Sequence, residues 1–419
     1  MSFGGVRIDI YANDGTTKLG AGPLNAIADL SYTEAVDELG AFAFACPAGH
    51  PRAGDLQLGR YVRIHLEGEG YVFQGRIEGR VIAAGADDRA RLEVSGWSSA
   101  VELTDLKTGY GFVLSDETMN DAVDALLAGT GWTRGSVDSA VVATYDLELN
   151  GMTRLEGLRK LAEVQGFLLR FDSRTRVVDM GALGEDPGLR FSRLEGPVSP
   201  RWQTERPDVV PIADIRVTAQ SEQIRNKVRI IGQMEGIDGD ALTLQHSNIN
   251  TPYARQSEVQ SDGRTVYFLA DAASIAEHGT REEDLVAREI RILGTGATER
   301  TRAANSLYGI GATFLGRHKD PVTNYAVRPV GLRHVAGGND VFAVGNRCPV
   351  FYRGWRKERA GRRVWLEVDD DLWLMRRERR VSANGERSWQ LTWSTTTREI
   401  PTDSAAVAQK LDEFRALAA

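Results

Sequence analysis

Residues 59–103 read GRYVRIHLEGEGYVFQGRIEGRVIAAGADDRARLEVSGWSSAVEL. Near its start, Val62, Ile64 and Leu66 alternate with more polar residues, as in a strand that has one buried and one solvated face. Turn-forming residues follow at 68–70 and at 86–88, and each turn precedes another alternating run. The stretch therefore predicts a meander of antiparallel strands.

A similar pattern returns near the end of the sequence. GNRCPVFY at 345–352 corresponds to GRYVRIHL at 59–66, LWLMRRER at 372–379 to YVFQGRIE at 71–78, and WQLTWS at 389–394 to LEVSGW at 92–97. Few residues are identical, so it is the alternation that repeats. We therefore expect two similar β modules with other material between them.

Length and composition indicate a multidomain globular protein. A chain of 419 residues is long for one hydrophobic core, so two to four domains are expected. The apolar content of 42% and the charged content of 26% are ordinary for globular proteins. The net charge of −7 argues against bulk nucleic-acid binding, which usually needs a basic excess, but it leaves a local basic patch open. No sequence-specific nucleic-acid binding is expected.

Cysteine usage and hydropathy restrict the compartment. Cys46 and Cys348 are too few for a disulfide framework, and two buried free thiols are favoured over one bridge. No run approaches the roughly 18 apolar residues of a membrane span. The N-terminus lacks the charged-then-apolar order of a signal peptide. We expect assembly in the cytoplasm of the cell that makes the protein.

Two helices are predicted in the segment that follows the first β module. Ser115 is a candidate cap for a helix that ends near Gly129, with an apolar face. Thr153 and Glu156 form a capping-box pattern at the start of a second helix, which Gly166 ends. A hairpin at 167–180 follows, so this segment is expected to be α+β.

The predicted fold class is mainly β with α+β insertions. A further helix is expected at 298–317 and a last one after Pro401. Asp369, Asp370 and Asp371 are expected in a hairpin turn, although they could also attract a cation. The expected domains are a first β-barrel at 1–103, an insertion at 104–200, a second β-barrel at 201–235 and 340–400, an insertion at 236–339, and a C-terminal helix at 401–419.

Five segments carry a resemblance to a known family through their order. They are GRYVRI with VFQGRI at 59–77, GW at 96–97 leading to LLAGTGW at 126–132, LRKLAEVQGF at 158–167, IRNKVRIIG at 224–232, and DAASIAEHGT at 271–280 before the Ala-rich helix at 297–316. This order resembles the baseplate or tail hub proteins of tailed phages and contractile injection systems, including siphophage tail-tip proteins. Each motif is short, and the resemblance spans nearly the whole chain.

The resemblance implies an architecture and a role. Each chain of such a hub has two tail-tube-like β-barrels, so three chains form a pseudo-sixfold ring that ends the tail tube and anchors a central fibre or spike. The implied partners are a homotrimer, the tail tube or a distal tail protein ring, a tail fibre or spike protein, and the tape measure protein. The implied location is the virion tail tip, with a mechanical role in host attachment and genome ejection.

The strongest basic run is RRERR at 376–380. On a strand its side chains alternate between two faces, so a solvated strand or an interface between subunits is favoured over a DNA-binding patch. Because a repelling channel suits outgoing DNA, we expect these arginines outside the bore. An apolar stripe in the last helix is a second candidate interface. The candidate interface residues are Arg376, Arg377, Arg379, Arg380, Val407, Leu411 and Phe414.

No catalytic, cofactor or metal site is predicted. The six histidines are scattered, and no His-Glu-x-x-His, Gly-x-Ser-x-Gly or phosphate-loop motif occurs. Two other functions stay open. A tail-associated cell-wall hydrolase predicts lytic activity of the isolated chain. A host-surface carbohydrate-binding tail protein predicts exposed aromatic residues in the insertions.

Overall fold

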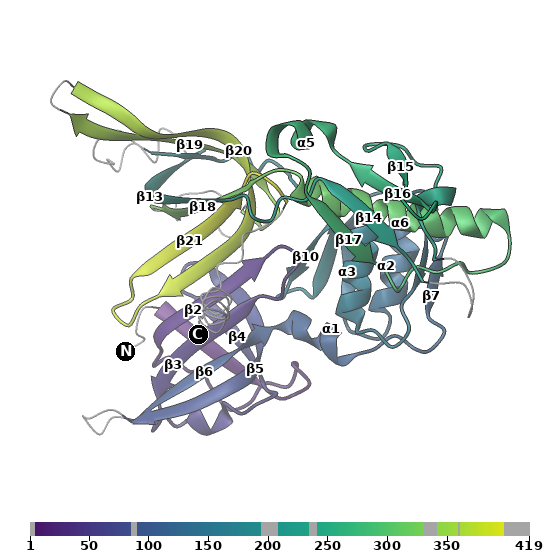
Figure 1. Ribbon diagram of the computed structural model, residues 1–419. Helices are drawn as coiled ribbons and strands as arrows, with labels where there is room; N and C mark the ends of the chain where they lie inside the picture. The colour runs from purple at the N-terminus through teal and green to yellow at the C-terminus, as the bar shows by residue number, and fades with distance from the viewer. Residues whose placement is uncertain are drawn as a thin grey trace, which may run out of the picture.

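The computed structural model describes residues 5–84, 90–193, 208–233, 241–330, 342–358 and 361–397. Two β modules lie one above the other in Figure 1, and the helices gather to one side of them. The predicted fold class, mainly β with α+β insertions, is confirmed.

The N-terminal module is built from the first six strands. Their order in the sheet is β1-β4-β5-β6-β3-β2. A backbone bridge between Ile8 and Leu24, just before β2, brings the two ends of this order together. The alternating residues Ile64 and Phe73 are fully buried in its core. The strands are β1 (Val6–Tyr11), β2 (Ala28–Ala35), β3 (Ala41–Pro47), β4 (Tyr61–Leu66), β5 (Gly70–Ala84) and β6 (Ala90–Ser98).

The C-terminal module is a closed ring of strands. Its order is β12-β19-β20-β21-β18-β13, and β12 pairs with β13 to close it. Trp393 fills its core beside Phe191, with ring centroids 4.9 Å apart. The strands are β12 (Arg190–Ser192), β13 (Val209–Gln220), β18 (Val322–Pro329), β19 (Arg347–Glu358), β20 (Gly361–Val381) and β21 (Arg387–Ser394).

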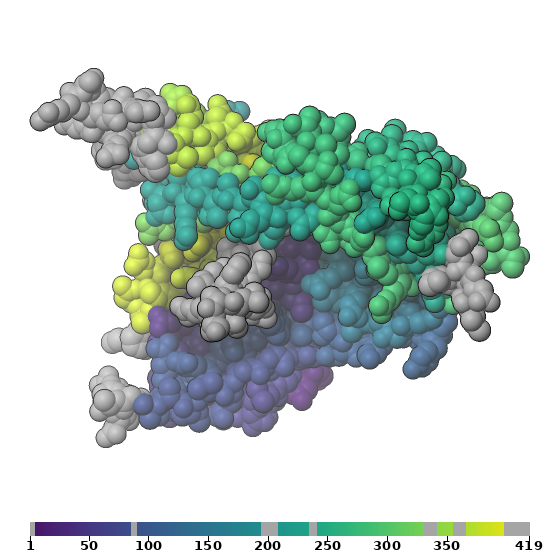
Figure 2. Space-filling view, in the orientation of Figure 1, coloured from purple at the N-terminus to yellow at the C-terminus, as the bar shows by residue number. Residues whose placement is uncertain are grey.

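The two segments inserted between these strands share one core and form one lobe, at the right of Figure 2. The first contains η3 (Ser99–Val101), α1 (Glu102–Asp105), β7 (Val113–Ser115), α2 (Met119–Leu127), β8 (Thr133–Val137), β9 (Asp146–Glu148), α3 (Arg154–Gln165), β10 (Leu168–Asp172) and β11 (Val177–Gly181). The second contains β14 (Lys227–Ile231), η4 (Leu244–His246), β15 (Arg255–Val259), β16 (Thr265–Ala270), α5 (Ala272–His278), β17 (Glu282–Val286) and α6 (Ala297–His318). A short helix, η2 (Ala53–Asp55), lies in the N-terminal module.

Helices α3 and α6 hold this lobe together. The capping box predicted for α3 is present: Thr153 Oγ1 accepts from the Glu156 N–H, and Glu156 accepts from the Thr153 N–H. Gly166 ends the helix in the left-handed conformation, as predicted. A Cβ at Gly309 of α6 would lie 2.1 Å from the carbonyl oxygen of Val164. The glycine therefore allows α6 to approach α3 closely.

The structure corrects four details of the sequence interpretation. Thr118, not Ser115, caps α2, because Ser115 ends β7 and donates to Asp146. Strand β14, expected in the second β module, pairs with β16 and β17 in the inserted sheet. Strands β12 and β18, expected in insertions, belong to the C-terminal module. The predicted C-terminal helix, 401–419, lies outside the described residues.

The fourth correction concerns the acidic run. Asp369, Asp370 and Asp371 lie inside β20 and pair with residues 349–351 of β19, so they form no turn. All three are exposed, while Val368 and Leu372 on either side are buried. Pairing along a long hairpin with β19 has overridden the weak intrinsic strand preference of aspartate.

Candidate functional site

The two β modules repeat the same strand order. Reading β1-β4-β5-β6-β3-β2 against β12-β19-β20-β21-β18-β13 matches each strand with one counterpart in order. The first strands differ in direction, since β1 is antiparallel to β4 whereas β12 is parallel to β19. In β5, Arg76 pairs with both Tyr61 and Trp97. In β20, Trp373 likewise pairs with both Arg347 and Ser394. The chain therefore contains two similar β modules, as the alternating pattern predicts.

The pairing also corrects the alignment of the middle strand. The sequence pattern aligned Leu372 with Tyr71, whereas the strand partners make Trp373 equivalent to Arg76. The register shifts just beyond these residues in both modules. The strand pairing skips Glu78 in β5 and Met375 in β20, and the new alignment makes these two residues equivalent. The outer strands of the two meanders, β4 with β19 and β6 with β21, match as predicted.

The modules are joined edge to edge by β2 and β20. These strands pair antiparallel over six residues each, from Leu30 opposite Val381 to Ala35 opposite Arg376. Because β20 also pairs with β21 here, the sheet runs without a break from one module into the other. This β2–β20 seam is the structural link between the duplicated halves.

Two buried ion pairs lie along the seam. Arg377 donates to Glu34 and Arg379 donates to Glu69 at 2.6 Å. The side chains of both arginines are less than a tenth exposed. Arg379 also lies over the Trp389 ring, 4.6 Å from its centroid. These two arginines, expected to be solvated or between subunits, therefore link the modules of one chain.

Their environments affect the two guanidinium groups differently. Burial pushes the pKa of Arg377 downward, but the attraction of Glu34 outweighs it and leaves the pKa raised. For Arg379 burial is the stronger effect, and its pKa is lowered despite Glu69. Both are expected to stay charged at neutral pH, because a guanidinium group in a protein is effectively always protonated.

The neighbouring arginines reach the surface. Arg376 pairs with Glu38 at 2.7 Å and Arg380 with Glu378 at 2.6 Å. Only these two of the four predicted interface arginines are accessible to another subunit. The other predicted interface residues, Val407, Leu411 and Phe414, lie outside the described residues.

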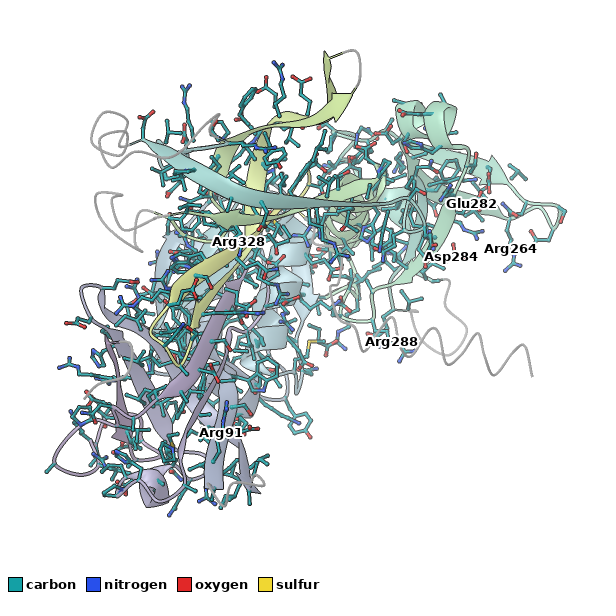
Figure 3. All side chains as sticks on the ribbon, turned by 90° about the vertical axis from the view of Figure 1, so that its left-hand side faces the viewer. Arg91, Arg264, Glu282, Asp284, Arg288 and Arg328 are labelled. Atoms are coloured by element: carbon teal, nitrogen blue, oxygen red, sulfur yellow. The ribbon has the colours of Figure 1, made fainter. Side chains whose placement is uncertain are left out.

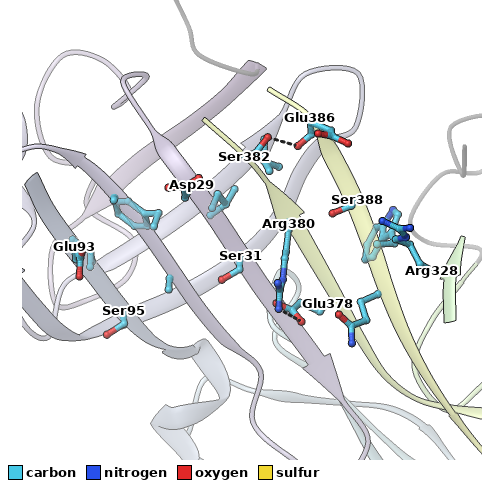
Figure 4. A pocket seen from close by; sticks show the side chains of 18 of the residues that line it. Asp29, Ser31, Glu93, Ser95, Arg328, Glu378, Arg380, Ser382, Glu386 and Ser388 are labelled. Atoms are coloured by element: carbon cyan, nitrogen blue, oxygen red, sulfur yellow. Dashed lines mark hydrogen bonds and ion pairs between the residues drawn. The ribbon is translucent and has the colours of Figure 1, made fainter. Parts of the chain in front are cut away.

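A groove of about 1040 Å³ runs across the joined sheet. It is lined by residues from eight strands that follow one another as β5-β6-β3-β2-β20-β21-β18-β13. Both cores lie behind this surface, which we call the groove face. Its side chains are mainly small or polar (Figure 4), and they include Ser31, Ser95, Ser388, Glu93, Glu378 and Arg380.

The charges on the groove face are largely balanced in ion pairs. Arg91 lies 3.1 Å from Asp29, and Arg328 lies 2.5 Å from Asp214. Figure 3 shows Arg91 on the lower module and Arg328 on the upper one. Together with the pair formed by Arg380, this arrangement gives a polar surface without a strong excess of either sign.

The groove face has an open strand edge at each end. Beyond Ile77, β5 pairs only with β6, so the other edge of 78–84 has no partner among the described residues. Beyond Ile212, β13 pairs only with β18, so one edge of 213–220 is open within the same described set. Sequence reasoning missed both edges. The available signal was the pair Val81–Ile82, two consecutive apolar residues that break the alternation.

No metal centre is found in the part of the chain that the structure describes. It contains no group of three or more His, Cys, Asp or Glu side chains placed to hold a metal ion. Cys46 and Cys348 are separate, buried free thiols, as predicted. The described segments also include no helix that is long and apolar enough to cross a membrane.

Comparison with known proteins identifies the fold. No protein-family model matches the sequence, and no curated protein matches it. Among solved structures, a 43 kDa tail protein of a Shewanella oneidensis prophage is 15% identical, with a TM-score of 0.58 over 92% of this chain and 98% of that one. A Neisseria meningitidis tail protein is 14% identical, with a TM-score of 0.56 over 93% and 96%.

A third solved structure extends this agreement. A prophage tail protein of Listeria monocytogenes is 11% identical and has a TM-score of 0.55 over 97% of this chain and 99% of that one. The chain therefore has the fold of phage tail proteins along nearly its whole length. The resemblance to phage tail proteins, inferred from the order of sequence motifs, is confirmed at the level of the fold.

Proposed function

We propose that this protein is the hub of a phage tail tip, in which three chains form a ring of six β modules. The observation that carries the proposal is the β2–β20 seam, which sets two equivalent modules side by side in one sheet. Three chains of two modules match a sixfold tube end, because each module occupies the place of one tube subunit. The tail-protein fold of the compared structures supports the same role.

In this proposal the groove face lines the central channel. Its serines and paired charges offer a polyanion little to hold, since Asp29 offsets Arg91 and Glu378 offsets Arg380. The expectation that the basic strand avoids the bore then holds for Arg377 and Arg379 but not for Arg380. Arg380 lies on the groove face, where Glu378 neutralises it.

The ring has two ends and therefore two kinds of partner. One end contacts the tail tube or a distal tail protein ring, and the other anchors a tail fibre or spike protein. The tape measure protein occupies the channel before genome ejection. The inserted lobe lies beside the two modules (Figure 1) and is placed to decorate the ring. The protein would act mechanically in the virion tail tip during host attachment, after assembly in the host cytoplasm.

The mass of the purified chain in solution tests the proposal. Light scattering over a concentration series should show a species of three chains of 46.0 kDa each. A chain that stays monomeric throughout contradicts the proposal. Zymography on host cell wall and pull-down with envelope carbohydrate provide the test of the hydrolase and carbohydrate-binding functions, and both assays should be negative.

A further inference from the structure

We propose that the open edge of β13 in one chain pairs antiparallel with the open edge of β5 in the next, so that a second copy of this chain completes the groove face. The inference rests on the proposed ring and specifies its joint. The pairing copies the β2–β20 seam, because β13 is the counterpart of β2 and β5 is the counterpart of β20.

The open edges of β5 and β13 correspond to edges of β20 and β2 that are occupied. The stretch of β20 that pairs with β21 uses its second edge to bind β2. The matching stretch of β5 pairs with β6 on one edge, and no described residue occupies its second edge. Likewise, the edge of β2 that faces away from β3 binds β20, whereas the matching edge of β13 is open beyond Ile212.

The register of the joint follows from the duplicated pairings. Tyr325 pairs with both Val217 and Trp393, as Phe42 pairs with both Tyr32 and Gly96. Val217 is therefore equivalent to Tyr32.

The same reasoning fixes the partner residue on β5. Arg379 pairs with Trp389, and Ile82 pairs with Leu92, the equivalent of Trp389. Ile82 is therefore equivalent to Arg379. Because Tyr32 lies opposite Arg379 in the seam, Val217 of one chain lies opposite Ile82 of the next.

The side chains at this joint suit burial. Ile82 is 57% exposed, Val81 58% and Val217 36%, and all three lie on the open edges. In the inferred register Val217 faces Ile82, and Thr218 faces Val81. Pairs of β-branched residues are favourable across antiparallel strands. The next pair places Ala219 opposite Arg80, where the small side chain leaves room for the arginine stem to extend to solvent.

Other edge strands of the molecule are protected differently. Strand β17 forms one edge of the inserted sheet and carries Glu282, Glu283 and Asp284. Figure 3 shows Glu282 and Asp284 on this strand. Charges of this kind keep edge strands from pairing with other chains. Three of the five residues of β17 are acidic, whereas the open stretch of β5 exposes Val81 and Ile82 next to each other, which favours a partner strand there.

The joint makes the channel wall continuous. Each chain contributes the eight strands of the groove face. Pairing β13 with β5 of the next chain repeats the seam between modules at every subunit boundary. The ring then alternates three seams within chains and three joints between chains. The seam within a chain contains buried ion pairs, whereas the joint between chains is apolar at the matching position.

Disulfide trapping tests the joint. Paired residues in antiparallel strands have Cα atoms about 4.5–5.5 Å apart, which a disulfide spans. The double variant Val217→Cys/Ile82→Cys should form covalent trimers on oxidation, as should Arg216→Cys/Ala83→Cys one position along. The control Val217→Cys/Val81→Cys places the thiols on opposite faces of the sheet and should stay uncross-linked. All these positions are solvent-accessible in one chain, so folding should be retained, as circular dichroism will check.

The possible cross-linking results test the inferred joint and the proposed ring separately. A species of three chains that cross-links only in the matched pairs supports the inference. A trimer that cross-links in the control, or in no variant, overturns the joint and leaves the proposed ring standing. A chain that is monomeric at every concentration overturns both.

A charge substitution gives an independent measure. Ile82→Lys should raise the concentration needed for assembly about tenfold or more, because a cation then lies on the apolar joint. Val286→Lys is the matched control, since Val286 is 65% exposed on the edge strand β17. Equal effects of the two substitutions would count against the joint.

Discussion

Arg377 on β20 lies directly opposite Glu34 on β2, and their side chains form a buried ion pair between the two β modules. The two residues are 343 positions apart in the sequence. The guanidinium group also donates to the carbonyl oxygen of Phe342. The ion pair thus secures the seam that brings the duplicated halves into one sheet.

Removing Arg377 should destabilise the protein strongly. Arg377→Ala leaves the Glu34 carboxylate buried without a cation, which typically costs about 3–5 kcal/mol. Arg380→Ala is the control, since its ion pair with Glu378 is exposed and worth about 0–1 kcal/mol. Urea unfolding followed by tryptophan fluorescence measures both. Similar losses of unfolding free energy in the two variants would show that the buried ion pair stabilises the protein no more than the exposed one.

Two glycines of α6 should respond to alanine in opposite directions. Gly309→Ala places a methyl group against the Val164 carbonyl oxygen of α3 and should cost about 1–3 kcal/mol. Gly316→Ala, on the exposed side of the same helix with no atom closer than 3.5 Å, should gain about 0.5–1 kcal/mol from helix propensity. Thermal unfolding compares the variants. A stabilising Gly309→Ala would contradict the close packing of α3 and α6.

The capping box of α3 should give a pH-dependent contribution. Hydrogen bonds from the backbone N–H and hydroxyl of Thr153 lower the pKa of Glu156 below its ordinary value of 4.5. Since the folded-state pKa is depressed, this stabilisation is present above pH 4.5 and is lost as pH falls through the lowered pKa.

At pH 7 the unfolding free energy of Glu156→Gln should therefore be lower than that of the unchanged protein. The difference should vanish at low pH. Thr153→Ala should cost about 1 kcal/mol at pH 7, because it removes the cap itself. Denaturant titrations at several pH values provide the measurement. A difference in unfolding free energy that grows as the pH falls would contradict the prediction that this stabilisation is lost at low pH.

The two native thiols should be unreactive in the folded chain. Cys46 and Cys348 are each 1% exposed. Burial raises the pKa of Cys46 to about 11 and also raises the pKa of Cys348. Ellman's reagent at pH 8 should label neither thiol in the native protein and both in denaturant. Rapid native labelling would contradict the burial of these residues, and it would require their replacement before disulfide trapping.

Much of the local structure could be predicted from the sequence because local rules decide it. The alternation in residues 61–66 determines β4, and the Thr153–Glu156 spacing determines the start of α3. Both features depend on residues within one turn or one strand. Their physical cause is therefore visible without knowing the rest of the fold.

The seam and the boundaries of the C-terminal module could not be predicted in the same way. Arg377 and Arg379 resemble a solvated basic run until Glu34 and Glu69 are brought beside them from the other module. The second inserted segment separates β12 and β13 from β18 and β19, so no short pattern joins these strands. The acidic residues of β20 suggest a turn, and only pairing with β19 keeps them in a strand.

Imaging the assembled protein along its axis tests the central claim most directly. Class averages from electron microscopy should show three chains as a closed ring of six similar β modules around a pore. At higher resolution β13 of each chain should pair with β5 of the next, with Val217 opposite Ile82. A ring whose chains meet through the inserted lobe, or a particle with any number of chains other than three, would contradict the account.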